Sequence, residues 1–122
     1  MHLFCSLSAS LILAVTALPR KKLFSGDGTY YNAGLGSCGV VSHDNQLIVA
    51  LNAPQMMNGA NPNVNKRCGT SIRVNGPKGS VTVKIVDTCP ACRYGSLDLS
   101  PSAFEHIADL AKGRVPITWN FM

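Results

Sequence analysis

The sequence lacks a long apolar run: its N-terminal hydrophobic stretch, Leu7–Ala17, is too short to span a bilayer. A stretch of this length is typical of an export signal, and Val15 and Ala17 supply the small residues that a cleavage site needs. The preceding segment has no Lys or Arg, only His2. We predict a signal peptide at residues 1–17 and a secreted, extracellular protein. The alternative is a buried N-terminal segment of the folded domain.

Acidic residues are few, and the chain has a net charge of +5. Three of the eleven cations are Arg20, Lys21 and Lys22. Without residues 1–22, eight cations stand against six acidic residues, which leaves a net charge of +2. A nucleic-acid partner is therefore not predicted. The basic segment at 18–22 is either a propeptide or a solvated charge run.

The remaining chain, residues 23–122, has no internal repeat or linker and is long enough for one small domain. It contains four cysteines: Cys38, Cys68, Cys89 and Cys92. An even number in a short secreted domain predicts two disulfides. Of the three possible pairings we favour Cys38–Cys68 with Cys89–Cys92. Cys38 and Cys68 are isolated, so neither a zinc site nor another cofactor is expected. There is no Asn-x-Ser/Thr site for N-glycosylation.

Short apolar or alternating segments predict a mainly β fold. We expect strands at residues 26–32, 47–51, 71–74, 80–86 and 115–121. One helix is predicted from Ser100, a natural N-cap, to Gly113, with a long loop at 53–67 that includes a helical turn near Pro54–Met57. Short strands, glycine-rich turns and one helix favour a small closed β-barrel.

The most informative run is VTVKIVDTCPACRYGSLDLSPSAF, residues 81–104. It predicts a strand that ends in Asp87, a tight Cys-Pro-Ala-Cys turn, then Asp98 and a capped helix. The turn follows a strand in a secreted chain, which favours a structural disulfide over a redox site. A structural interpretation exists for both carboxylates: Asp87 could accept backbone N–H bonds in the turn, and Asp98 could brace the helix entry.

Several motifs along the chain resemble those of one known family. They are GDGTYYN, GSCGVVS, LIVALN, CGTSIRVNGPKGSVTVKIVDTCPAC, YGSLDLSPSAF and GRVPITW. They resemble the double-psi β-barrel of the expansin, barwin and rare-lipoprotein-A group, and are most similar to its small, single-domain secreted members of fungal type. The resemblance implies a six-stranded barrel with one or two short helices and a groove across one face.

The resemblance also implies which residues line the groove. Asp98 matches the acid of barrel-type endoglucanases, which expansins also require, and Asp87 matches the aspartate beside it. Thr29 stands where those endoglucanases carry the catalytic base, and a threonine cannot serve as that base. Asp27, two residues earlier, could share the face of the same strand.

Relatives that cleave peptidoglycan carry a histidine in the segment that here is Ala50–Ala53, which has none. We expect His43 and His106 to be solvated surface residues. The endoglucanase interpretation thus lacks the base carboxylate, and the peptidoglycan-cleaving interpretation lacks the histidine. We therefore expect binding rather than catalysis.

Three functions follow from the resemblance. The first is binding of cell-wall polysaccharide (cellulose, chitin or peptidoglycan) in a groove lined by Asp98, Asp87, Thr29, Tyr94 and Tyr30. The second is inhibition of a secreted cysteine protease, or binding of another protein, through the loop Asn52–Arg67 with its exposed Met56 and Met57. The third is cleavage of a glycan. No membrane partner is predicted, and a monomer is expected.

Overall fold

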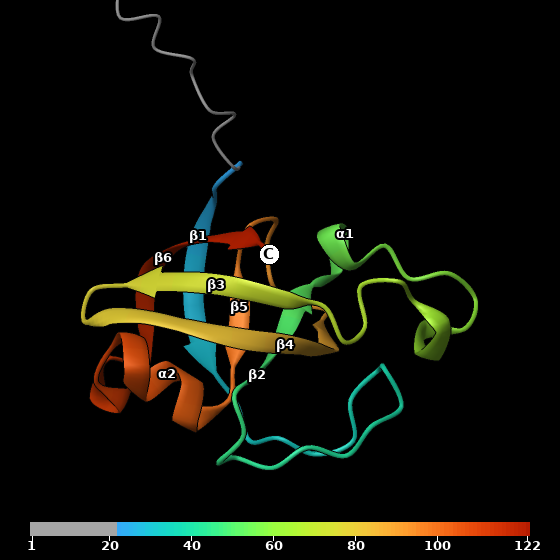
Figure 1. Ribbon diagram of the computed structural model, residues 1–122, viewed down its shortest axis with the longest axis horizontal. Helices are drawn as coiled ribbons and strands as arrows, with labels where there is room; N and C mark the ends of the chain where they lie inside the picture. Colours follow the sequence, from blue (N-terminus) through green and yellow to red (C-terminus); the bar gives the residue numbers. More distant parts are fainter. Residues whose placement is uncertain (1–21) are drawn as a thin grey trace, which may run out of the picture.

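The computed structural model describes residues 22–122, which form a closed barrel of six strands (Figure 1). The strands are β1 (Phe24–Tyr30), β2 (Ile48–Asn52), β3 (Ser71–Gly76), β4 (Gly79–Cys89), β5 (Leu97–Leu99) and β6 (Arg114–Phe121). Their order around the barrel is β1-β5-β2-β4-β3-β6, and β6 closes it by pairing with β1. The fold is the predicted six-stranded β-barrel. The predicted signal peptide and all but one residue of the 18–22 segment lie outside the described residues.

The sheet is mixed, and its pairs join segments that are distant in sequence. β1 pairs with β5, and β2 pairs with β4, in parallel, whereas the other four pairs are antiparallel. β5, with three residues, was not predicted from the sequence. The predicted first strand is displaced by two residues, because the chain leaves β1 after Tyr30.

Short helices fill the connections. They are α1 (Ala53–Met56), α2 (Pro101–Ile107) and the 3₁₀ helices η1 (Pro62–Val64) and η2 (Leu110–Lys112). Ser100 caps α2 as predicted: its Oγ accepts a hydrogen bond from the N–H of Ala103 at 3.2 Å. The prediction that this helix continues to Gly113 is wrong. The carbonyl of Ile107 accepts a hydrogen bond from Lys78 in the β3–β4 turn, and the chain becomes extended at Ala108.

The core lies inside the barrel and beneath α2. Alternate residues of β6 and β4 point inward, as their sequence patterns predict. The largest fully buried side chains include Trp119, Phe104, Leu51 and Met56. The indole Nε1 of Trp119 donates to the carbonyl of Gly95 at 2.8 Å, so its one polar atom is satisfied within the core. Met56, which was expected to be exposed, is instead buried against the barrel, whereas Met57 is exposed.

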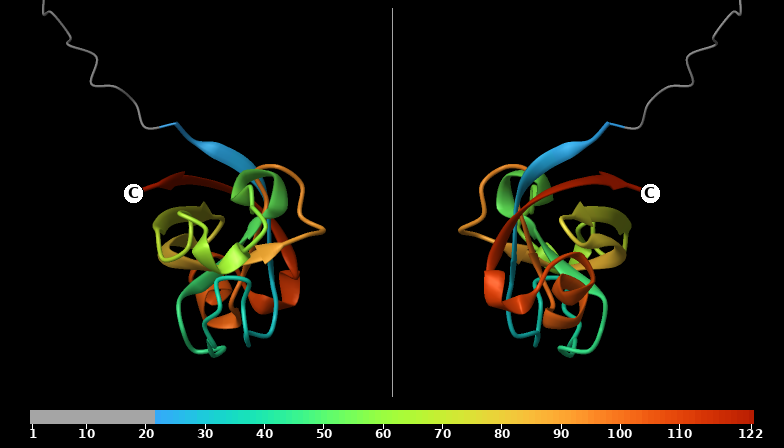
Figure 2. Two further views of the ribbon diagram at one scale, coloured as in Figure 1. Left: turned by 90° about the vertical axis from the view of Figure 1, so that its right-hand side faces the viewer. Right: turned by 90° about the vertical axis from the view of Figure 1, so that its left-hand side faces the viewer.

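Two disulfides secure the connections, in the pairing favoured from the sequence. Cys38–Cys68 joins the β1–β2 connection to the segment before β3, and Cys89–Cys92 closes the turn after β4. The β1–β2 connection and the α1–β3 connection come forward together in the left-hand view of Figure 2. Within residues 22–122, no helix has the length and hydrophobicity needed to cross a membrane.

Candidate functional site

Residues from five strands form one row across the outside of the barrel. The register pairs Asp87 of β4 with Ala50 of β2, and Ala50 with Asp98 of β5. It then pairs Asp98 with Thr29 of β1, and Thr29 with Arg114 of β6. Paired residues point to the same face of a sheet, so all five side chains are on the outer face of the barrel, where Ala50 is covered and buried. The barrel thus aligns both predicted aspartates with Thr29.

A β-bulge in β4 is responsible for the outward position of Asp87. In the pairing of β2 with β4, Val49 is opposite Ile85, but the next residue, Ala50, is opposite Asp87. Val86 is therefore the extra residue of the bulge. Strict alternation from the inward Ile85 would have directed Asp87 into the core, where an unpaired carboxylate is very unfavourable. The bulge reverses the alternation and brings Asp87 to the outside.

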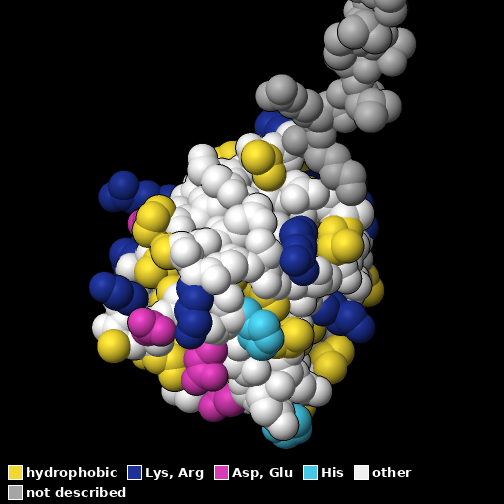
Figure 3. Space-filling model, turned by 60° about the vertical axis from the view of Figure 1, so that its left-hand side comes forward, with side chains coloured by type: hydrophobic (Ala, Val, Ile, Leu, Met, Phe, Trp, Pro, Cys, Tyr) yellow, Lys and Arg dark blue, Asp and Glu magenta, His cyan; other side chains and the backbone are white. Residues whose placement is uncertain are grey.

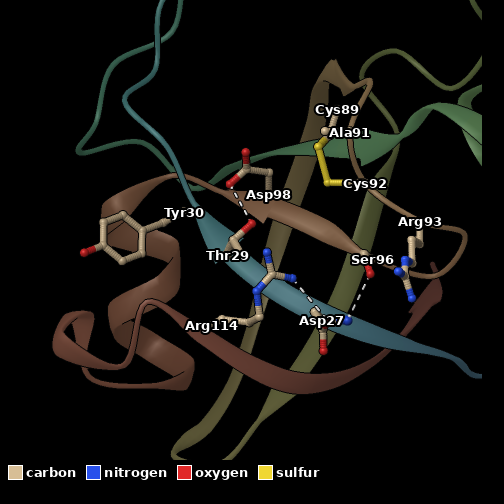
Figure 4. A pocket seen from close by; sticks show the side chains of 10 residues that line it. All are labelled: Asp27, Thr29, Tyr30, Cys89, Ala91, Cys92, Arg93, Ser96, Asp98 and Arg114. Atoms are coloured by element: carbon tan, nitrogen blue, oxygen red, sulfur yellow. Dashed lines mark hydrogen bonds and ion pairs between the residues drawn. A yellow bond between two sulfur atoms is a disulfide. The ribbon is translucent and has the colours of Figure 1, made fainter.

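The row crosses a groove with a volume of about 640 Å³ (Figure 4). The groove is lined by Asp27, Thr29, Tyr30, Cys89, Ala91, Cys92, Arg93, Ser96, Asp98 and Arg114. Two carboxylates, two guanidinium groups and one aromatic ring therefore face a single open depression. A volume of this size lies within the range of small-molecule sites.

Asp98 occupies the middle of the groove and is half-buried. Its Oδ1 accepts a hydrogen bond from the Oγ1 of Thr29 at 3.0 Å. Burial raises the pKa of Asp98, and the nearby Asp87 carboxylate raises it too, whereas the hydrogen bond from Thr29 and the charge of Arg114 act in the opposite direction. Asp98 does not brace the entry to α2, because Ser100 provides that cap. Its carboxylate instead faces the groove.

An ion pair borders Asp98. Arg114 Nη1 lies 3.1 Å from Asp27 Oδ2, and both side chains are more than half exposed. Asp27 is two residues before Thr29 on β1 and so faces the same side, as the sequence suggested. Its backbone N–H donates to the Oγ of Ser96 at 3.1 Å, which ties β1 to the segment before β5.

Tyr30 provides the aromatic wall of the groove. Its ring centroid lies 4.8 Å from that of Phe104, and its hydroxyl donates to the carbonyl of Leu110 at 3.1 Å. Both ends of the side chain are therefore fixed by α2 and by the segment that follows it. The turn closed by Cys89–Cys92 forms the facing wall (Figure 4).

Two predicted groove residues do not line the groove. The Oδ1 of Asp87 accepts hydrogen bonds from the backbone N–H groups of Ser37 and Thr88, both at 2.8 Å. Burial raises the pKa of the adjacent Tyr31, and the Asp87 and Asp98 carboxylates raise it further. Asp87 thus anchors the β1–β2 connection at the end of the row. Tyr94 is exposed and packs edge-on against Phe24, with the ring centroids 6.1 Å apart.

Three polar lining residues, Arg93, Ser96 and Arg114, were not predicted from the sequence. The chain places Arg114 beside Asp27 only when β6 closes the barrel, 87 positions further along. No local pattern reveals such a contact. His43 and His106 are exposed and outside the groove lining, as expected. Within residues 22–122, there is no cluster of three or more His, Cys, Asp or Glu side chains that could hold a metal ion.

The fold and the groove define a small disulfide-bonded barrel with a polar surface depression. The sequence profile of the lytic transglycolase family matches residues 24–119. The chain therefore belongs to the expansin and rare-lipoprotein-A-like family of double-psi β-barrel proteins.

Relatives within this family have different descriptions. The chain is 35% identical to a papain inhibitor of Streptomyces mobaraensis in an alignment of 109 positions that covers 86% of this chain and 76% of the inhibitor. It is 33% identical to an EG45-like domain containing protein of Citrus jambhiri, covering 78% of this chain and 79% of that protein. It is 43% identical to expansin-YoaJ of Bacillus subtilis over only 51 residues, 42% of this chain and 22% of the expansin.

Solved structures show the same fold. The Streptomyces papain inhibitor superimposes with a TM-score of 0.77 at 35% identity, covering 86% of this chain and 98% of the inhibitor. A mutant expansin of Clavibacter michiganensis, solved in complex with cellohexaose, superimposes with a TM-score of 0.72 at 30% identity. That match covers 83% of this chain, which spans half of the expansin.

Proposed function

We propose that the protein is secreted and binds cell-wall polysaccharide in the groove around Asp98. The observation that carries the proposal is the half-buried Asp98, fixed by Thr29 in the middle of an open polar groove. A carboxylate in this position can accept charge-assisted hydrogen bonds from sugar hydroxyls. The fixed ring of Tyr30 offers an apolar surface on which a sugar face can stack. The complex of a related expansin with cellohexaose supports the same ligand class.

The geometry favours binding over cleavage. An inverting glycosidase needs an acid and a base, and Asp98, with its raised pKa, has the character of the acid. The second carboxylate in the groove, Asp27, is engaged in an ion pair with Arg114, and Thr29 lies directly beside Asp98. The groove thus offers no separate carboxylate poised as a base. Release of soluble sugar from a glucan, chitin or peptidoglycan, abolished by Asp98→Asn, would contradict this conclusion.

The test is a pull-down of the protein with insoluble cellulose, chitin and peptidoglycan. Asp98→Ala is compared with Asp109→Ala, which removes an exposed carboxylate that pairs with Lys78 outside the groove. A hydrogen bond to a charged group contributes about 1.5–3 kcal/mol, so Asp98→Ala should weaken retention roughly 10- to 100-fold. Asp109→Ala should be retained like the wild type. Equal retention of both variants, or no retention of the wild type on any polymer, contradicts the proposal.

Inhibition of a papain-like cysteine protease is the second candidate function. It is favoured because the match to the papain inhibitor covers 86% of this chain and 98% of the solved inhibitor, at 35% identity and a TM-score of 0.77. Titration of papain with the protein tests it directly. No inhibition at micromolar excess would remove this candidate.

A further inference from the structure

Five strongly exposed large hydrophobic side chains lie on two adjacent loops. They are Leu35, Val40 and Val41 in the β1–β2 connection, and Met57 and Val64 in the α1–β3 connection; each is between 55% and 78% exposed. We refer to these five side chains as the two-loop surface. Isolated exposed hydrophobic residues are common, but a group of this kind indicates an interaction site. On the face drawn in Figure 3, by contrast, hydrophobic side chains occur among charged ones.

The two loops are held together in space. The Cys38–Cys68 disulfide joins them, and Gly39 lies so close to Asn63 that a Cβ on this glycine would be 3.0 Å from the Asn63 Oδ1. Val40 follows Gly39 and Val64 follows Asn63, so these two valines lie on neighbouring parts of the surface. Met57 and Val64 border a shallow hollow of about 380 Å³. Both loops are in front in the left-hand view of Figure 2.

Internal hydrogen bonds give the first loop a defined conformation. Gly36 N–H donates to the Val40 carbonyl at 3.1 Å, and Leu35 and Val41 form an antiparallel bridge. Cys38 N–H donates to the Val86 carbonyl at 3.2 Å, and Ser37 N–H donates to Asp87. The turn between Leu35 and Val41 is therefore attached to the bulge of β4.

The second loop is ordered by Asn65, whose Nδ2 donates to the Met56 carbonyl at 2.8 Å and to the Asn58 Oδ1 at 2.7 Å. Because both loops are already ordered, little conformational entropy remains to be lost when a partner binds.

The chemistry of the two-loop surface fits a protein better than a glycan. Residues 33–42 and 53–65 contain no Asp, Glu, Lys or Arg. The centres of protein interfaces are similarly poor in charged residues and rich in methionine. Aliphatic side chains do not offer the aromatic planes on which sugars stack. The two-loop surface lies next to β4, whereas Asp27 and Arg114 of the groove are on β1 and β6. In the closed strand order β1 is three positions from β4, so the two-loop surface and this side of the groove are on different sides of the barrel.

We propose that the two-loop surface docks a papain-like cysteine protease by inserting its aliphatic side chains into an apolar part of the protease cleft. This inference rests on the second function proposed above. The match to the papain inhibitor covers 86% of this chain and 98% of the solved inhibitor. Polysaccharide binding in the groove does not depend on the two-loop surface.

Papain titration with variants of each loop tests the inference. Val40→Asp and Val64→Asp change one exposed side chain on each loop, and Leu23→Asp is the matched control, because Leu23 is similarly exposed (60%) but adjoins β1. Asp98→Ala reports on the groove. We expect the wild type, Leu23→Asp and Asp98→Ala to inhibit papain equally, and each valine variant to weaken inhibition at least tenfold. Thermal unfolding of every variant verifies that the fold is retained.

Each other outcome overturns the inference in a recognisable way. If the wild type inhibits papain and the valine variants inhibit equally well, protease inhibition stands but its surface lies elsewhere. If Asp98→Ala alone loses inhibition, the protease binds at the groove. If the wild type does not inhibit papain at micromolar excess, both the docking inference and the second candidate function are wrong. The polymer pull-down then decides the groove proposal independently.

Discussion

The two disulfides differ greatly in the length of chain that they close, which predicts unequal contributions to stability. Cys38–Cys68 has a sequence separation of 30, and Cys89–Cys92 has a separation of 3. In the chain-entropy account, a cross-link stabilises the fold by restricting the unfolded chain, more so for a longer loop. The closed loops of about 31 and about 4 residues correspond to roughly 3.7 and 1.9 kcal/mol, respectively.

The prediction is tested with two paired variants, Cys38→Ser with Cys68→Ser and Cys89→Ser with Cys92→Ser. The first pair should be less stable than the second by about 1.8 kcal/mol. For a domain of about 100 residues this corresponds to a difference of roughly 7–14 °C in the melting temperature. Thermal unfolding followed by circular dichroism under non-reducing conditions measures it. Equal losses, or a larger loss for the Cys89 and Cys92 pair, would refute the entropic reasoning and show that the short disulfide stabilises the native groove wall directly.

Two further predictions concern the anchored loop and the titration of the groove. Gly36→Ala places a Cβ against the Val86 carbonyl oxygen, closer than van der Waals contact allows, whereas Gly34→Ala meets nothing within 4 Å. The first should destabilise the fold by about 1–3 kcal/mol and the second should be neutral or slightly stabilising, as urea unfolding will show; equal effects would contradict the close approach. Because burial raises the pKa of Asp98, lowering the pH should protonate this carboxylate, and so reduce polymer retention, already above the usual aspartate range. Asp98→Asn should lose this pH dependence. It should not lose stability at neutral pH, since above its raised pKa the ionised form of Asp98 opposes folding. An unchanged pH profile in Asp98→Asn would assign the titration to another group.

The elements of the barrel that could be predicted from the sequence are those whose structure is controlled by a local sequence pattern. The alternation of Val115, Ile117 and Trp119 gave the inward face of β6, and Ser100 marked the start of α2. The end of α2 was missed because it depends on a tertiary hydrogen bond from Lys78 to Ile107. β5 was missed because a strand of three residues carries too little periodicity to be recognised.

The candidate site was only partly predictable for the same reason. The family resemblance predicts Asp98 and Thr29, and the need of a sugar site for an aromatic ring predicts Tyr30; all three line the groove. Asp87 was placed in the same groove, but its carboxylate holds the backbone of the β1–β2 connection. The bulge at Val86 that sets its direction is a change in register, which alternation along β4 alone cannot reveal.

The position of β1 between β5 and β6 has a consequence for the order of folding. Both partners of β1 come from residues 97–121, so this strand cannot pair until almost the whole chain is available. Such distant pairing predicts slow folding, in milliseconds to seconds. During that interval β1 is an unpaired segment that could associate with other chains. Its sequence, FSGDGTY, contains two glycines and an aspartate and is a poor template for intermolecular sheets. The same glycines that let Gly95 and Ile117 approach β1 closely in the native barrel thus also protect the chain from aggregation before the barrel closes.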